Sequence, residues 1–216
     1  KGVIINTGTA RYAGRVSVDQ TISDKIKAGI TTDYTETDTY GQVVRSLYTS
    51  NATASALVRA WMYRPISADP DEDLLTDPGD VSIITPSDFR INPVIDLENQ
   101  YQHTINDIFK ANAYVSYDIT KHLTFKSQAG IMQVKARNEQ FYNSKTSQGS
   151  PLNPNNTNGV WGYLSMTDAR GFSNENTLNY KQTFGNGHTL SGLLLFGVNS
   201  YKSFNTNFRG TNLPNE

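Results

Sequence analysis

The sequence predicts an all-β fold, a transmembrane antiparallel β-barrel or part of one, with long extracellular loops. Hydrophobic and hydrophilic residues alternate with a period of two over long segments, as they do along strands with two different faces. Turns of a few residues join these segments in pairs, whereas connections of tens of residues separate one pair from the next. Only 18% of the residues are charged, and the many Thr, Ser, Asn, Gly and Tyr residues suit strands and turns.

The first predicted hairpin covers about residues 10–36. Between residues 11 and 22 the even positions are mostly apolar, whereas the odd positions carry Arg11, Arg15 and Asp19. A turn at Ser23 and Asp24 is followed by a second alternating segment. Two long alternating segments joined by a tight turn are typical of a β-hairpin.

Two further hairpins are predicted at about residues 106–136 and 172–202. Their turns lie around Lys121 and around Gly185–Gly187. The last strand alternates less regularly, because Leu193 and Leu195 occupy its otherwise polar side. The whole chain, residues 1–216, is therefore interpreted as part of one β-barrel domain.

Long connections are predicted at about residues 37–104 and 140–165. Compact soluble domains rarely contain connections of this length, whereas outer-membrane barrels combine short periplasmic turns with long extracellular loops. A short amphipathic helix is expected near residues 54–62, ended by Pro65. The alternative is a soluble β-sandwich, a binding or adhesin domain for glycan or protein, with loops of similar length at both ends and a more apolar core.

Several function classes find no support in the sequence. The net charge of −1 gives no basic surplus for nucleic acid, and the absence of cysteine removes thiol chemistry. No stretch of 18 apolar residues could form a membrane-spanning helix, although a spanning strand needs only about 9–11 residues. We find no catalytic constellation, and expect neither an enzyme nor a cofactor. The expected location is the outer membrane of a bacterial cell, in contact with lipid.

The candidate ligand-binding residues are four aromatic side chains in or beside the long connections, Trp61, Tyr63, Trp161 and Tyr163. Each has an apolar ring with a polar tip, which suits stacking on a sugar or a peptide. For each of them the alternative is packing within a loop or a place in the aromatic girdle of the membrane interface.

A weak calcium-loop pattern begins at Asp69 and includes Asp71 and Asp73. Such a loop needs glycine at its sixth position, where this chain has Leu74, and its second position is Pro70. We therefore expect a solvated acidic loop and no metal, and a calorimetric titration with calcium would test this.

Five motifs occur in one order along the chain. They are Lys1-Gly2-Val3-Ile4-Ile5, Arg11 to Asp19, Asn92-Pro93, Leu123 to Gly130, and Glu175 to Tyr180 followed by Phe184-Gly185 and His188-Thr189-Leu190. In this order they resemble the barrel of SusC-like TonB-dependent receptors of Bacteroidetes. The second motif has Ser17 where that family more commonly has Asn.

The resemblance implies a barrel of 22 strands closed by a plug, of which this chain would be a fragment. The lack of an initiator Met agrees with that expectation. Receptors of this family import oligosaccharides or peptides with energy delivered by TonB-ExbB-ExbD. They work with a SusD-like surface lipoprotein. The plug and the TonB box are expected to lie outside these residues.

Overall fold

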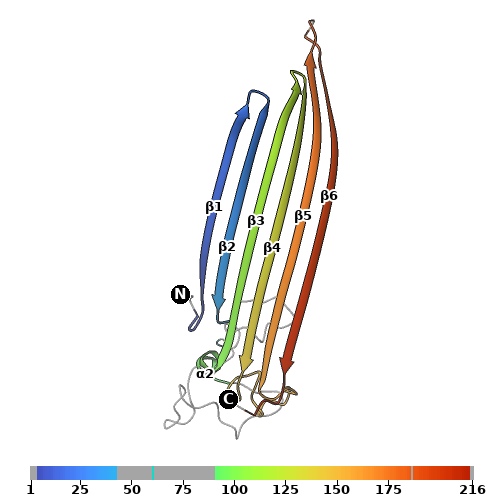
Figure 1. Cartoon of the computed structure of the whole chain (residues 1–216). Helices are drawn as coiled ribbons and strands as arrows, with labels where there is room; N and C mark the ends of the chain where they lie inside the picture. The colour runs from blue at the N-terminus through green and yellow to red at the C-terminus, as the bar shows by residue number, and fades with distance from the viewer. Residues whose placement is uncertain (1–3, 43–59, 61–90, 186, 215–216) are drawn as a thin grey trace.

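The computed structural model describes residues 4–42, 60, 91–185 and 187–214. In these residues six long strands form one antiparallel sheet in sequence order, each pairing with the next (Figure 1). The strands are β1 (Gly8–Ser23), β2 (Ile26–Tyr40), β3 (Gln100–Thr120), β4 (Leu123–Tyr142), β5 (Trp161–Thr183) and β6 (Thr189–Gly210). The described residues thus form a single sheet, not the two packed sheets that a β-sandwich requires.

The three hairpins extend further from their turns than the sequence indicates. β3 begins at Gln100, six residues before the predicted start, and β5 begins at Trp161. At these ends both faces of the sheet carry polar residues, so the alternation that reveals a strand is absent from the sequence. The observed connection between β4 and β5 is correspondingly shorter than predicted, covering residues 143–160.

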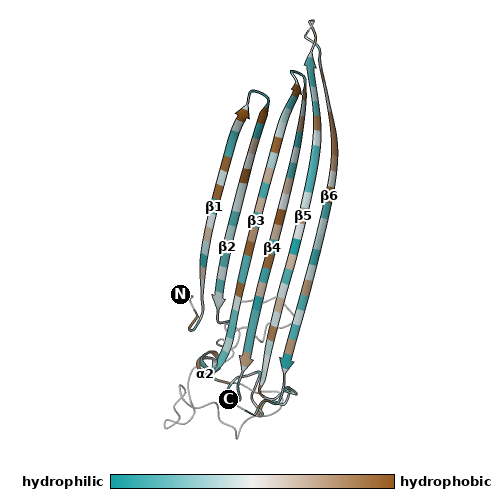
Figure 2. Cartoon of the chain, viewed as in Figure 1, coloured by the Kyte–Doolittle hydropathy of each residue, from teal (hydrophilic) through white to brown (hydrophobic). Residues whose placement is uncertain are grey.

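The register gives the sheet two chemically different faces. Directly paired residues of antiparallel strands point to the same side, so the pairs Val18–Ile30 and Ile30–Ala113 place all three residues on one face. We call it the banded face; it holds the even residues of β1, β2, β5 and β6 and the odd residues of β3 and β4. The opposite face, the polar face, includes Arg15 and Asp33. Figure 2 shows hydrophobic and hydrophilic residues alternating along the strands.

The hairpin turns are staggered along the sheet, as Figure 1 shows. Ile26 at the first turn pairs with Tyr117, and β3 continues three residues further to Thr120. Leu123 at the second turn pairs with Tyr180, and β5 again continues three residues further. Three residues span about 10 Å, and two strand spacings are also about 10 Å. Turns lying in one plane would therefore require strands tilted by roughly 45° from its normal, close to the tilt in outer-membrane barrels.

A short helix and a loop cap the sheet at the end opposite the turns. The helix α2 (Pro93–Asn99) begins after Asn92, whose side chain accepts a hydrogen bond from the Val94 amide at 2.9 Å. The buried Asp96 accepts a bond from the Ser147 amide at 2.6 Å, which ties the β4–β5 loop to the helix. The small buried core lies here, while both faces of the strands are largely accessible. It comprises Ile91, Ile95, Leu97, Tyr142 and Trp161, whereas the buried Ala169 lies further along β5.

No helix in the described part of the chain is long and apolar enough to cross a membrane. The helix predicted near residues 54–62 lies almost entirely outside the described residues.

Candidate functional site

An apolar band occupies the banded face on the side of the hairpin turns. On β2 it runs from Ile26 to Tyr34, and on β3 from Ile119 to Phe109. These runs of 9 and 11 residues match the length that a tilted strand needs to cross a membrane. Within the band no outward residue of the six described strands is charged, and its side chains are accessible, with Ile30 50% exposed. The apolar side chains of the band are Tyr12, Val16, Val18, Ile22, Ile26, Ala28, Ile30, Tyr34, Phe109, Ala111, Ala113, Val115, Tyr117, Ile119, Leu123, Phe125, Ala129, Ile131, Phe172, Leu178, Tyr180, Leu190, Leu194, Phe196 and Val198.

Two amides interrupt the band on β5, and each donates a hydrogen bond within the sheet. The Asn176 side chain donates to the Asn174 side chain at 2.6 Å, and Asn174 donates to the Gln128 carbonyl at 3.2 Å. A polar group in a lipid environment must find its hydrogen-bond partners within the protein. These contacts make the two amides compatible with a membrane-facing surface.

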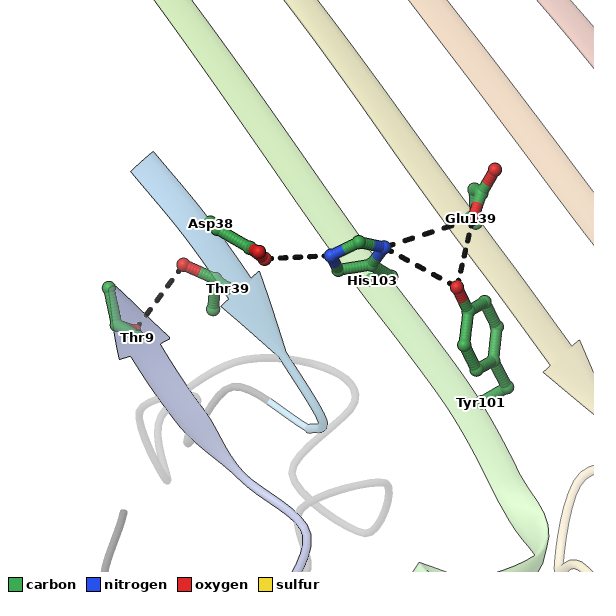
Figure 3. Close-up of polar contacts among 6 residues, drawn as sticks. All are labelled: Thr9, Asp38, Thr39, Tyr101, His103 and Glu139. Carbon is green, nitrogen blue, oxygen red and sulfur yellow. Dashed lines mark hydrogen bonds and ion pairs between the residues drawn. The ribbon is translucent and has the colours of Figure 1, made fainter. Parts of the chain in front are cut away.

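A charged belt follows the apolar band on the same face, further from the turns. It consists of Glu36, Asp38, His103, Asp107, Lys135, Arg137, Glu139, Asp168, Arg170 and Lys202. Figure 3 shows His103 between two carboxylates from neighbouring strands, with Nε2 2.7 Å from Asp38 and Nδ1 3.9 Å from Glu139. The belt thus links β2, β3 and β4 by polar contacts between side chains on the banded face.

The belt lies outside the apolar band, and its ion pairs are exposed; the Arg170 side chain is 70% accessible. Arg170 donates to both carboxylate oxygens of Asp168, at 3.2 and 3.0 Å. These hydrogen bonds lower the pKa of Asp168 below its ordinary value, with a smaller contribution from the nearby charge of Lys135. Asp168 is therefore ionised at neutral pH.

The polar face beside the belt carries no charged side chain on β2 to β5, and on β6 only Arg209 at its end. We call this surface the neutral patch. It comprises Thr35, Thr37, Thr39, Gln100, Gln102, Thr104, Asn106, Asn138, Gln140, Tyr142, Tyr163, Ser165, Thr167, Tyr201, Ser203, Asn205 and Asn207. Amides and hydroxyls both donate and accept hydrogen bonds, so this surface can bind an uncharged polar solute in many orientations.

Hydrogen bonds between neighbouring strands hold the side chains of the neutral patch in place. Gln102 donates to the Tyr142 hydroxyl at 2.8 Å, and the Tyr163 hydroxyl donates to Asn207 at 3.1 Å. Thr167 donates to an amide oxygen of β6 in the same way, at 2.7 Å. Each amide retains further donors or acceptors that a ligand can use, because an Asn or Gln side chain offers two of each kind.

The four predicted aromatic residues divide between different environments. Tyr163 lies in the neutral patch, as described above. Trp161 begins β5 and is only 9% exposed, because it stacks on Tyr142 with ring centroids 4.5 Å apart and lies against Arg209. Its indole also donates to the Gln148 carbonyl at 3.2 Å. Trp61 and Tyr63 lie outside the described residues. Ligand contact stays a prediction for all four.

The calcium-loop candidates Asp69, Asp71 and Asp73 also lie outside the described residues. Among the residues that the structure describes, no group of three or more His, Asp or Glu side chains is arranged to hold a metal ion.

The amides of the neutral patch were not among the predicted site residues. An isolated Asn or Gln carries no motif, and it becomes a candidate only when the register places it beside others. The signal present in the sequence is the separation of charge: between residues 134 and 142 the odd positions carry Lys135, Arg137 and Glu139, whereas the even positions carry none.

No protein-family model and no curated protein matches the sequence. Solved structures do match, and the chain shares its fold with a peptide transporter. The structure of the RagAB peptide transporter aligns with 96% of this chain at a TM-score of 0.59 and 16% identity. The RagAB peptide importer aligns in its closed-closed state at a TM-score of 0.58 and 16% identity, over 96% of this chain. In its open-open state the TM-score is 0.59, the identity 15% and the coverage 95%.

In each case this chain spans 22% of the matched transporter chain. At this level of identity the similarity establishes the fold alone, an antiparallel sheet like a segment of a β-barrel wall, and leaves role, substrate and partners to be inferred from the residues. The expected all-β barrel fold is therefore confirmed.

Proposed function

We propose that the six strands form part of the wall of an outer-membrane barrel that imports oligosaccharides or peptides in a TonB-dependent manner. The observation that carries the proposal is the distribution of charge. One face has an uncharged apolar band of membrane-spanning length, and the opposite face has an uncharged surface of amides and hydroxyls behind the charged belt. The first surface suits lipid and the second suits a hydrated solute path.

The orientation of the sheet follows from the same distribution. Lipid requires that outward side chains be predominantly apolar over about 25 Å, and on all six strands the band is mostly apolar and free of charged side chains. The polar face then lines the lumen, with the short turns in the periplasm and the loop-covered end outside the cell. In this orientation the charged belt lies just above the outer edge of the hydrocarbon layer.

The neutral patch then lies in the extracellular half of the lumen, where a solute enters. Its side chains can form hydrogen bonds with the backbone amides of a peptide or the hydroxyls of a sugar. Because the patch carries no charge, it gives no preference for cationic or anionic solutes. The similarity to a peptide importer supports peptides as the first solute to test. Transport, and not catalysis, is the role that we propose.

The proposed partners follow from the resemblance and from the matched transporter. A SusD-like surface lipoprotein would cover the extracellular end, and TonB-ExbB-ExbD would act through segments other than those described. The shared fold with a RagAB transporter supports a receptor that pairs with a second component.

The proposal is tested with the complete receptor and its lipoprotein partner, purified in detergent. The probes are an uncharged octapeptide and the uncharged oligosaccharide maltoheptaose, with binding measured by isothermal titration calorimetry. Replacing Tyr163 and Asn207 by Ala removes a hydrogen-bonding pair from the lumen, and the dissociation constant of the bound probe should rise roughly tenfold.

Tyr101 provides the matched control, because it is a hydrogen-bonded tyrosine at a similar height on the opposite face. Tyr101→Ala should leave the affinity unchanged. Equal losses for both variants, or no binding of either probe class to a properly folded receptor, would contradict the proposal.

A further inference from the structure

The charged belt has a basic side and an acidic side. On β4, β5 and β6 its cations are Lys135, Arg137, Arg170 and Lys202, against the two acids Glu139 and Asp168. On β2 and β3 its charged groups are acids together with one histidine, as Figure 3 shows in part. An anion that approaches the banded face would therefore bind on β4 to β6.

Two of these cations lie opposite each other. Arg170 of β5 pairs directly with Lys202 of β6, and like charges in this position repel each other unless an anion lies between them. Glu139 is neutralised by Arg137, and Asp168 is hydrogen-bonded to Arg170. Among the described residues, Lys135 and Lys202 form no ion pair, although Asp168 and Asp107 flank Lys135 on the neighbouring strands.

A shallow pocket of about 420 Å³ lies beside these cations on the same face. Its apolar lining comes from Ile105, Met166 and Phe204, and Phe204 is 72% exposed. Lys135 and Arg137 also line the pocket, together with Asp107 and Asp168. A pocket with an apolar wall and cations at its edge suits an amphiphile that carries an anionic group.

The position of the cations relative to the apolar band identifies the kind of amphiphile. Arg170 lies two residues beyond Phe172, and Lys202 lies four residues beyond Val198, the last apolar residues of the band on β5 and β6. At a tilt of roughly 45° these separations correspond to about 5–10 Å above the band. Lipid headgroups occupy this layer, and a basic side chain there attracts anionic headgroups.

We infer that Lys135, Arg170, Lys202 and the adjoining pocket bind the phosphate-bearing headgroup of a lipid in the outer leaflet. The phosphate lies between the Arg170 and Lys202 side chains, and the acyl chains extend from it toward Phe172 and Val198 in the apolar band. Met166 and Phe204 lie further from the band and contact the apolar faces of the headgroup's sugar rings. This site rests on the membrane orientation proposed above. It differs from the solute path, because it lies on the opposite face of the sheet.

The test uses the complete receptor, delipidated in detergent, with monophosphoryl lipid A as the probe and native mass spectrometry as the measurement. Lys135→Gln with Lys202→Gln removes two cations that hold no ion pair. Each basic residue near a lipid surface contributes about a fivefold change in affinity, so the dissociation constant should rise about 25-fold. Lys27→Gln with Lys110→Gln removes the same charge from the polar face and should leave it unchanged.

Two further measurements identify the bound group. Lipid treated with phosphatase should bind weakly to the wild type, and inorganic phosphate should fail to displace the intact lipid. Displacement by inorganic phosphate would show a site for free anions and overturn the inference, as would equal effects of the two double variants. A dimer in which these residues are buried between two copies would also overturn it.

The failure of this inference and that of the proposed function can be told apart. A receptor that migrates as a heat-modifiable barrel and binds solute, but retains full lipid affinity in the Lys135→Gln, Lys202→Gln variant, refutes the lipid site alone. A chain that forms no barrel in detergent refutes both.

Discussion

Gly29 shows how a single residue controls contacts across three strands. Tyr114 of β3 reaches over Gly29 of β2, and its hydroxyl donates to Asp19 of β1 at 2.7 Å. A Cβ at Gly29 would lie 2.6 Å from the Tyr114 ring, closer than real Cβ contacts. The ammonium group of Lys126 lies 4.9 Å from the centre of the same ring. Tyr114 therefore contacts charged side chains of both β1 and β4.

Gly29→Ala is therefore expected to displace Tyr114 and break its bond to the Asp19 carboxylate. Because this bond to a charged group is exposed, its loss should lower the free energy of unfolding of the complete barrel by less than the loss of a buried one would. Urea titration in phospholipid vesicles measures the change.

Gly14 gives the matched control, because a Cβ at this position would meet no atom within 4 Å. Gly14→Ala should be neutral or slightly stabilising, since it only restricts the unfolded chain. Equal destabilisation by both substitutions would show that the cost comes from the strand backbone and not from Tyr114.

At the scale of the strand, the apolar band determines what each position tolerates. Ile30 lies midway along the band on β2, whereas the next residue, Thr31, points to the polar face. A lysine on the lipid side of a barrel costs about 2–4 kcal/mol at the membrane midplane and little near its edges. Ile30→Lys should thus destabilise the barrel by that amount, while Thr31→Lys should change its stability by less than about 1 kcal/mol.

Both variants are refolded into vesicles in a urea titration. The folded fraction is measured from the difference in gel mobility between boiled and unboiled samples. If Thr31→Lys proves the more damaging of the two, then the assignment of the two faces is reversed.

The sequence predicted the strands well where one face is apolar and the other polar. The hairpins around Asp24, Lys121 and residues 184–188 lie where the alternation placed them. The alternation fails in the strand extensions furthest from the turns, where Glu36 or Glu139 on one face alternates with Thr or Gln on the other. Helix α2 was missed although Asn92 and Pro93 form a recognisable helix start, because the helix is only seven residues long.

The candidate site was less predictable than the fold. Aromatic residues were selected by type, and one of them, Tyr163, lies in the neutral patch, whereas the buried Trp161 packs on Tyr142. The patch itself depends on the register of five strands, which brings Gln102, Asn138 and Asn207 onto one face. No local pattern in the sequence reports such a long-range arrangement.

For the whole molecule, the decisive property is that the sheet is open. Within the described residues, β1 and β6 each pair on one side only, which leaves two long edges of backbone groups without partners. Such edges promote aggregation in water and are not tolerated in lipid. The strand stagger and the match to part of a transporter chain agree with the fold of a barrel-wall segment.

The most direct test of this account is a scan of spin labels along β3 in the complete barrel, reconstituted in vesicles. The 216 residues contain no cysteine, so single cysteines can be introduced at each position from 109 to 117. Collision rates with oxygen, which concentrates in lipid, are measured for every label. If the banded face contacts lipid, the rates will be high at odd positions and low at even positions, with a period of two. Uniformly low oxygen collision rates along the segment, or high rates at the even positions, would show that the banded face does not contact lipid.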